Sequence, residues 1–294
     1  MANLKEVKGR IQSVVSTQQI TKAMKMVAAA KLRRAQDNIT QMRPYAQKLT
    51  GMLQNLSAQQ DENSEGGDFS EVRSVNRVLL LVVTSDKGLC GAFNSNIFKT
   101  TNRHIKAQYQ KQFDSGNVDV LPIGKKALDY FTKRDYNVIA DYWDMFSPVD
   151  FEKSTSISTF AMEKFLDGAY DKVDIVYNEF KNVATQVLQV EQFLPVLPPQ
   201  DNEESNFEVD YIFQPSRKEI VEDLIPKSLK VQVFKAILES NAAEHGARMT
   251  AMDQATDNAG ELLKELKLTY NRTRQAAITT EILEIVAGAE ALGS

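Results

Sequence analysis

The last stretch of the chain, residues 226–294, constrains the fold most. No proline follows Pro226, and only two glycines come before Gly288. Apolar or small residues return at alternating spacings of three and four: Val231, Phe234, Leu238, Met252, Ala255, Ala259, Leu262 and Leu266. This pattern predicts a long helix with a seam for a partner helix. Some 65 helical residues would span roughly 100 Å, so the seam must find its partner outside any one globular core.

The first 56 residues carry a matching seam. Steps of four and three from Leu4 to Leu56 meet apolar residues except at three consecutive seam positions, Gln18, Thr21 and Lys25. Around that polar interruption, apolar side chains occupy other faces: Val15, Ile20, Met24, Met26 and Val27. We therefore predict a second long helix that contacts something besides its coiled-coil partner here. Pro44 should bend this helix or begin a new helical segment.

Between the two helices the pattern changes. Residues 57–76 are almost free of apolar side chains and predict an exposed linker. Residues 77–197 then alternate strand and helix patterns, with helices at 125–134 and 151–170 and a helical stretch that runs to about Gln112. The expected strands are 78–83, 118–124, 137–140, 173–180 and 187–197, the last an edge or hairpin strand.

This alternation predicts a small, mostly parallel α/β (Rossmann-like) domain inserted between the helices. Residues 198–226 would form a connecting segment and foot, and 227–294 the C-terminal coiled-coil helix. Because the ends of an inserted domain lie close together, residues 1–56 and 227–292 should run side by side and antiparallel.

Composition narrows the function classes. The chain is 43% hydrophobic and 25% charged, as in ordinary globular proteins. A single cysteine, Cys90, excludes an intrachain disulfide, and with two histidines it predicts no ordinary zinc site and no cofactor. No apolar run predicts a membrane span, and the N-terminus lacks the apolar core of a signal peptide.

Charge is unevenly distributed. Residues 1–56 hold ten basic and two acidic side chains, whereas the whole chain has a net charge of −4. A basic arm on an acidic body indicates an acidic partner, either nucleic acid or protein, although a solvated helix face has the same signature. A basic coiled-coil protein that binds nucleic acid is thus one alternative, but the arm lacks the patterns of groove-reading proteins.

The loop of residues 84–91 is the main candidate for chemistry, because phosphates bind between a buried strand and a helix in α/β folds. It matches neither common phosphate-loop motif, so a tight structural turn is the better interpretation. Cys90 could act as a nucleophile only beside a base, and nothing indicates that His104 meets it. A small enzyme is therefore a third, disfavoured hypothesis.

Four blocks of the sequence resemble the gamma subunit of F-type ATP synthases: 17–32, 85–91, 248–252 and 270–289. The resemblance covers nearly the whole length, and the family has the same order of helix, inserted α/β domain and helix. It implies a non-catalytic central rotor shaft. In the family this shaft couples c-ring rotation to the conformational cycle of the catalytic beta subunits.

The resemblance also implies partners and contact residues. The expected partners are the alpha–beta ring, epsilon and the c-ring, on the cytoplasmic face of a bacterial plasma membrane. Met24 would lie at a torque-sensitive contact with beta. The acidic lever segment of beta would face the basic residues Lys31, Arg33 and Arg34. The gripping loops of beta would bind Arg248 and Gln275. An apolar sleeve would surround Ile282, Leu283, Ile285 and Val286. Tyr211 and Phe213 would belong to the foot near epsilon and the c-ring, where Gln214 departs from the acidic residue of many members.

Overall fold

The computed structural model describes residues 4–58, 68–146, 148–183, 185–196 and 217–293. The chain divides into two compact units. The first consists of residues 1–28 with 248–294, and the second of residues 29–247. The two longest helices, α1 (Leu4–Ala58) and α6 (Arg217–Gly293), each contribute to both units.

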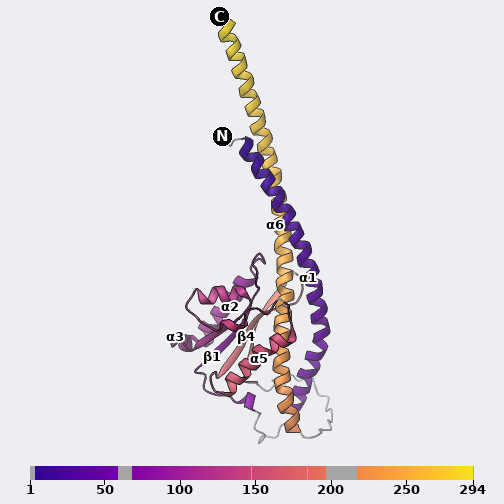
Figure 1. Cartoon of the computed structure of the whole chain (residues 1–294), viewed down its shortest axis with the longest axis vertical. Helices are drawn as coiled ribbons and strands as arrows, with labels where there is room; N and C mark the ends of the chain where they lie inside the picture. Colours follow the sequence, from indigo (N-terminus) through magenta and orange to yellow (C-terminus); the bar gives the residue numbers. More distant parts are fainter. Residues whose placement is uncertain (1–3, 59–67, 147, 184, 197–216, 294) are drawn as a thin grey trace. The chain divides into compact units, whose positions relative to one another are not determined.

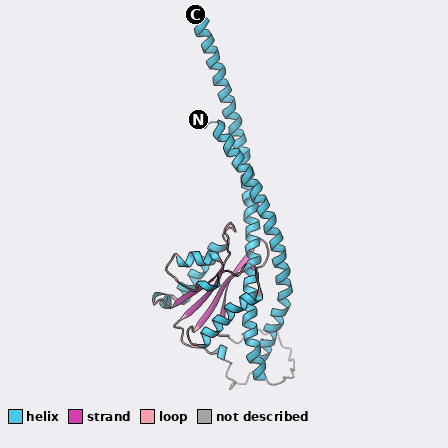
Figure 2. Ribbon diagram, viewed as in Figure 1, coloured by secondary structure: helices cyan, strands magenta, loops and turns pink. Residues whose placement is uncertain are grey.

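The second unit contains a five-stranded sheet in the order β3-β2-β1-β4-β5 (Figure 2). The strands are β1 (Val78–Val83), β2 (Val118–Ile123), β3 (Asn137–Val138), β4 (Lys172–Phe180) and β5 (Gln186–Leu194). All neighbouring strands are parallel except β4 and β5, which form an antiparallel edge. Every residue of β1 is buried, which explains its unbroken run of valine and leucine. The predicted mostly parallel α/β sheet is confirmed.

Helices cover the sheet. They are α2 (Phe93–Gln108), α3 (Gln110–Asp114), α4 (Lys125–Thr132) and α5 (Phe151–Leu166), with short 3-10 turns at Asp68–Ser70 and Ala140–Tyr142. The main core lies between one sheet face, α5 and the first part of α6 (Figure 1). Ile225, Leu229 and Val233 of α6 are buried in it. Part of the long C-terminal helix is thus a core helix of the α/β domain.

The helices confirm the predicted seams with some differences. α1 continues through Pro44, so no new segment begins there. α6 begins at Arg217, ten residues before the predicted start, and includes Pro226. A proline removes one helical hydrogen bond, but the burial of Ile225 and Leu229 on either side favours a continuous helix. Leu53 and Leu56 lie where side chains are not described.

Two predicted helices differ from expectation: one is broken into α2 and α3, and one ends early. The stretch after Phe93 breaks at Tyr109, whose hydroxyl donates a hydrogen bond to Asp174 on β4 at 2.5 Å. The helix that begins at Phe151 ends at Leu166, because Gly168 adopts a positive φ of 71° that terminates the helix. The third strand is only two residues long and is followed by a 3-10 turn.

Three buried tyrosines of the second unit donate hydrogen bonds to carboxylates: Tyr109 to Asp174, Tyr170 to Asp119 and Tyr177 to Glu191. Burial, and then the neighbouring carboxylate, raises the pKa of each tyrosine. Above about pH 10 the unfolded chain therefore loses these protons while the folded chain keeps them. The stability that they contribute is complete below that pH and is lost as the pH rises.

We expect the unfolding free energy to fall above pH 10 by about 1.4 kcal/mol per pH unit for each of these tyrosines. Denaturant titrations between about pH 9 and pH 11 can be followed by the fluorescence of Trp143, the single tryptophan. Tyr109→Phe should remove the contribution of one proton from the slope of unfolding free energy against pH. Tyr45→Phe, at an exposed position, should leave that slope unchanged. Equal slopes in all three proteins would contradict this assignment.

Candidate partner-contact surfaces

In the first unit, α1 and α6 run antiparallel and meet in a polar layer. Lys25 Nζ donates to Asp253 Oδ1 at 2.5 Å, and Thr256 Oγ1 donates to Thr21 Oγ1 at 2.8 Å. A side chain at Gly260 would meet Gln18 Nε2 at 3.0 Å. The three polar seam positions of α1 are therefore matched by polar or small residues of α6, an arrangement that specifies helix register.

The seam of α6 differs from the prediction in one respect. Leu262 is 46% exposed, and the buried or half-buried positions instead run through residues 259, 263, 266 and 270. Both spacings are compatible with a coiled coil, so only the helix's rotation about its axis distinguishes them. On α1, every predicted seam position whose side chain is described is buried or half-buried.

Three of the apolar residues that leave the α1 seam, Ile20, Met24 and Val27, follow helical spacing and so share one face, the α1 patch, whereas Met26 lies on another face. Ile20 is 60% exposed, Met26 61% and Val27 58%, and Met24 is half-buried. Because large apolar side chains that gather on a surface mark interaction sites, this patch fits the predicted contact outside the coiled coil.

Lys31, Arg33 and Arg34 lie on α1 in the second unit. All three side chains are exposed, whereas the intervening Leu32 and the following Ala35 are buried. The heptad pattern explains this arrangement, because burial of the seam turns the flanking positions to the surface. Three neighbouring cations on one helix turn suit an acidic partner.

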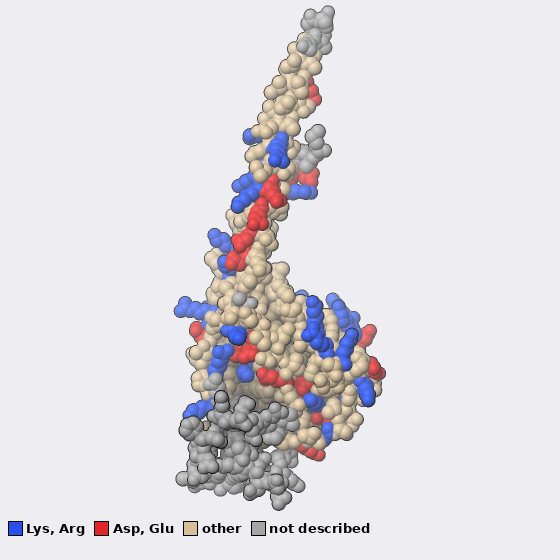
Figure 3. Space-filling view, turned by 180° about the vertical axis from the view of Figure 1, so that it is seen from behind, with Lys and Arg blue, Asp and Glu red and all other residues tan. Residues whose placement is uncertain are grey.

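The end of α6 exposes apolar side chains around the helix: Ile282 at 54%, Leu283 at 63%, Ile285 at 71% and Val286 at 50%. Few charges accompany them, and the stretch of α6 next to its grey end is mostly tan in Figure 3. In Figure 1 this end extends past the first turns of α1. A helix that is apolar on several sides is normally covered, so this end fits a surrounding apolar partner. Gln275 is also exposed there, and Arg248 is half-buried.

The loop of residues 84–91 connects β1 to the neighbouring helices. Asn94 Nδ2 donates to Ser85 Oγ at 2.8 Å, and the backbone nitrogen of Lys125 donates to Asp86 Oδ1 at 3.1 Å. Cys90 is buried, with Asn94 Nδ2 at 3.3 Å from its sulfur. The side chains of Ser85, Asp86 and Cys90 are thus engaged in local structure, as the tight-turn interpretation predicts.

His104 has a partner other than the cysteine. Its Nε2 lies 2.7 Å from Asp174 Oδ2, and its ring packs edge-on against Tyr109. Within the described ranges, no three His, Cys, Asp or Glu side chains are grouped so that they could hold a metal ion. None of the helices formed by these residues has an apolar stretch suited to crossing a membrane.

Comparison with known proteins decides the family. The family model described as ATP synthase matches residues 3–292. An ATP synthase gamma chain from Cytophaga hutchinsonii is 55% identical over 296 residues, covering 100% of both chains. One from Flavobacterium johnsoniae is 56% identical over 292 residues, covering 99% of both. This chain belongs to the ATP synthase gamma-chain family.

Solved structures show that the fold is shared with rotor subunits. The rotor of the Euglena gracilis mitochondrial ATP synthase matches with a TM-score of 0.64 at 22% identity, over 94% of this chain and 98% of that chain. A central-stalk chain from Tetrahymena thermophila matches with a TM-score of 0.55 at 24% identity, over 80% and 99%. Family membership gives no support to the nucleic-acid-binding alternative.

Most of the residues predicted to contact partners lie on three surfaces, the α1 patch, the basic turn and the α6 end, whereas Arg248 lies half-buried in the middle of α6. Tyr211, Phe213 and Gln214 lie outside the described residues. Asp253 and Thr256, which complete the polar layer, were not predicted from the sequence. Searching the C-terminal helix for polar residues opposite Thr21 and Lys25 in antiparallel register would have found both.

Proposed function

We propose that this chain is the central rotor shaft of a proton-translocating F-type ATP synthase. It couples ion-driven rotation of the c-ring to the conformational cycle of the catalytic beta subunits and makes no bonds itself. The observation that carries this proposal is the 55% identity with an ATP synthase gamma chain over 100% of both chains.

The described geometry meets the physical requirements of a shaft. Two wound helices resist bending and twisting better than one, and the polar layer fixes their register. A rotor must also make unequal contacts, because it shifts the equilibrium of a neighbour only through differential interaction with that neighbour's states. The exposed apolar and basic surfaces lie on one or the other helix, which provides this inequality.

Each surface has a proposed partner. Met24 and the rest of the α1 patch contact beta, and Lys31, Arg33 and Arg34 face its acidic lever segment. Beta loops bind Arg248 and Gln275, and an apolar sleeve of the alpha–beta ring surrounds the end of α6. Apolar contacts suit a turning helix, because they are not directional. The segment with Tyr211 and Phe213 meets epsilon and the c-ring, so that the chain is peripheral at the cytoplasmic face of a bacterial membrane.

Reversing two charges of the basic turn tests the proposed contact with an acidic segment. Arg33→Glu with Arg34→Glu places like charges together, so we expect the ATPase rate of the reconstituted complex to fall about tenfold at low salt. Raising the salt should restore part of it by screening. Lys99→Glu with Lys106→Glu, at exposed positions of α2, is the matched control. Equal loss in both pairs, or no loss at Arg33 and Arg34, would contradict the contact.

Co-purification tests the function as a whole. The chain is captured from membranes in mild detergent, and the masses of the subunits that accompany it are measured. We expect alpha, beta, epsilon and the c subunit. Capture of the chain without beta would contradict the proposal, as would hydrolysis of ATP by the purified chain alone. A salt-dependent shift with duplex DNA at physiological ionic strength would instead favour nucleic-acid binding.

A further inference from the structure

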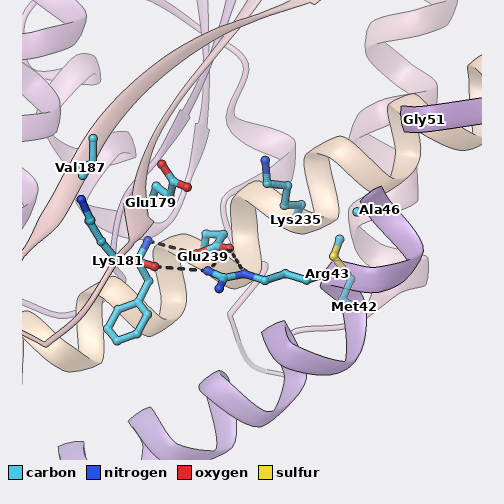
Figure 4. Close-up of a pocket in the computed structure, with 10 residues that line it drawn as sticks. Met42, Arg43, Ala46, Gly51, Glu179, Lys181, Val187, Lys235 and Glu239 are labelled. Atoms are coloured by element: carbon cyan, nitrogen blue, oxygen red, sulfur yellow. Dashed lines mark hydrogen bonds and ion pairs between the residues drawn. The ribbon is translucent and has the colours of Figure 1, made fainter. Parts of the chain in front are cut away.

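Three elements of the second unit meet beside a cavity of about 780 Å³. Met42 and Arg43 come from α1, Glu179 and Lys181 from the end of β4, and Lys235 and Glu239 from α6. Figure 4 shows Arg43 extending from α1 toward Glu239, with the backbone at the end of β4 beside both. The three elements are distant in sequence, so their meeting here depends on the tertiary fold.

The contacts form one connected group. Arg43 Nε and Nη2 donate to Glu239 Oε1 at 3.3 Å and 3.1 Å. The other carboxylate oxygen of Glu239 accepts from the backbone nitrogen of Phe180 at 3.1 Å. Arg43 Nη2 also lies 3.4 Å from the backbone oxygen of Phe180, to which it donates. Phe180 is the last residue of β4, so this group joins the sheet to both long helices.

The carboxylate of Glu239 is removed from solvent, which makes its hydrogen bonds important. The Glu239 side chain is 2% exposed, whereas Arg43 is 50% exposed. A buried carboxylate needs hydrogen-bond donors in fixed places, and those donors come here from α1 and β4. The apolar contacts of Ile225, Leu229 and Val233 also hold α6 on the sheet, but apolar packing is less directional than a charged hydrogen bond.

We propose that Arg43 and Glu239 are positioning residues that clamp the α/β domain to both long helices at the end of β4. The clamp has a mechanical role, and this role rests on the proposed rotor function. Torque applied to the α/β domain reaches α1 and α6 together through it. Loss of the clamp leaves the chain folded on its apolar core but more compliant in torsion.

The experiment measures torsional stiffness in the assembled complex. The alpha–beta ring is immobilised and stalled, and a bead is attached through biotin at Lys111→Cys, an exposed position of α3. The native Cys90 is buried, so one site is labelled. The angular variance of the bead is inversely proportional to the stiffness. Arg43→Ala and Glu239→Gln should each raise the variance about twofold, and the double variant should add little, because both changes remove one clamp.

Two controls separate the clamp from general damage. Lys227→Ala removes an exposed ion pair with Asp223 within α6 and should leave the variance unchanged. A disulfide can replace the part of the clamp that joins β4 to α6, because a Cβ on Gly246 of α6 would lie 3.8 Å from the Cα of Val183, in the turn after β4. That spacing suits a bridge between Val183→Cys and Gly246→Cys.

The bridge is formed by oxidation before labelling, and the same bead is followed before and after dithiothreitol. With Glu239→Gln, which weakens the link between β4 and α6, reduction should raise the variance about twofold; with Glu239 present, reduction should change it little. Unchanged variance in both Arg43→Ala and Glu239→Gln would overturn the clamp. A variance that does not change when the bridge is reduced in the clamp variant would also overturn it. If Glu239→Gln fails to assemble, recovery of assembly with the bridge supports the clamp, and failure to recover overturns it. A wild-type bead that never turns with ATP would count against the rotor function instead.

Discussion

Replacing Gly124 by alanine is expected to destabilise the second unit by more than about 3 kcal/mol. Gly124 follows β2 with a φ of 104°, and a Cβ there would lie 2.3 Å from the backbone oxygen of Thr84. The oxygen belongs to the residue that follows β1, so this clash can be relieved only if β1 and β2 move apart. Such a clash adds to the backbone strain of the positive φ.

Gly116→Ala is the matched control. Gly116 also has a positive φ, of 72°, but a Cβ there meets nothing within 4 Å. Only backbone strain remains, and we expect a loss of about 1 kcal/mol. Denaturant unfolding followed at Trp143 compares the two, and the Trp143 backbone oxygen accepts a hydrogen bond from Gly124 itself at 2.9 Å. Similar losses at both glycines would show that the close approach to Thr84 is not decisive.

Replacing Met24 by lysine is expected to weaken coupling while leaving the complex assembled. Met24 is half-buried in the α1 patch, where the proposed contact with beta is apolar. A lysine adds a charge that interacts unequally with the conformations of beta, and about 1 kcal/mol of such inequality changes a population roughly fivefold. We expect the protons pumped per ATP in reconstituted vesicles to fall at least about threefold, measured with the ATPase rate on the same preparation.

Met52→Lys is the control for this change, because Met52 lies on α1 in the second unit and is 41% exposed. It should leave pumping per ATP unchanged. Undiminished pumping with Met24→Lys, in a complex that contains all its subunits, would count against the contact.

Periodicity in the sequence predicted much of the fold, because the partner of each long helix lay within the chain. The α1 seam and the buried strand β1 were found from residue type alone, since their burial follows a simple repeat. Whether Leu262 or residue 263 lies in the seam of α6 was not predictable. Spacings of three and four residues can alternate in either order until a partner helix fixes the rotation of α6 about its axis.

Other features depended on tertiary contacts. The start of α6 ten residues early, with Pro226 inside it, follows from packing of Ile225 and Leu229 on the sheet. The pairing of Arg43 with Glu239 joins residues 196 positions apart, and no local pattern indicates it. The candidate contact residues came from the family resemblance, and the structure adds that most of their described side chains are exposed.

The most direct measurement is the motion of the chain inside its complex. A bead is attached at Lys111→Cys, the alpha–beta ring is fixed to a surface, and ATP is added. The proposed rotor function predicts sustained rotation of the bead in one direction, which stops when ATP is exhausted. A bead that stays fixed while the same complex hydrolyses ATP at its full rate would contradict the proposal that this chain is the shaft.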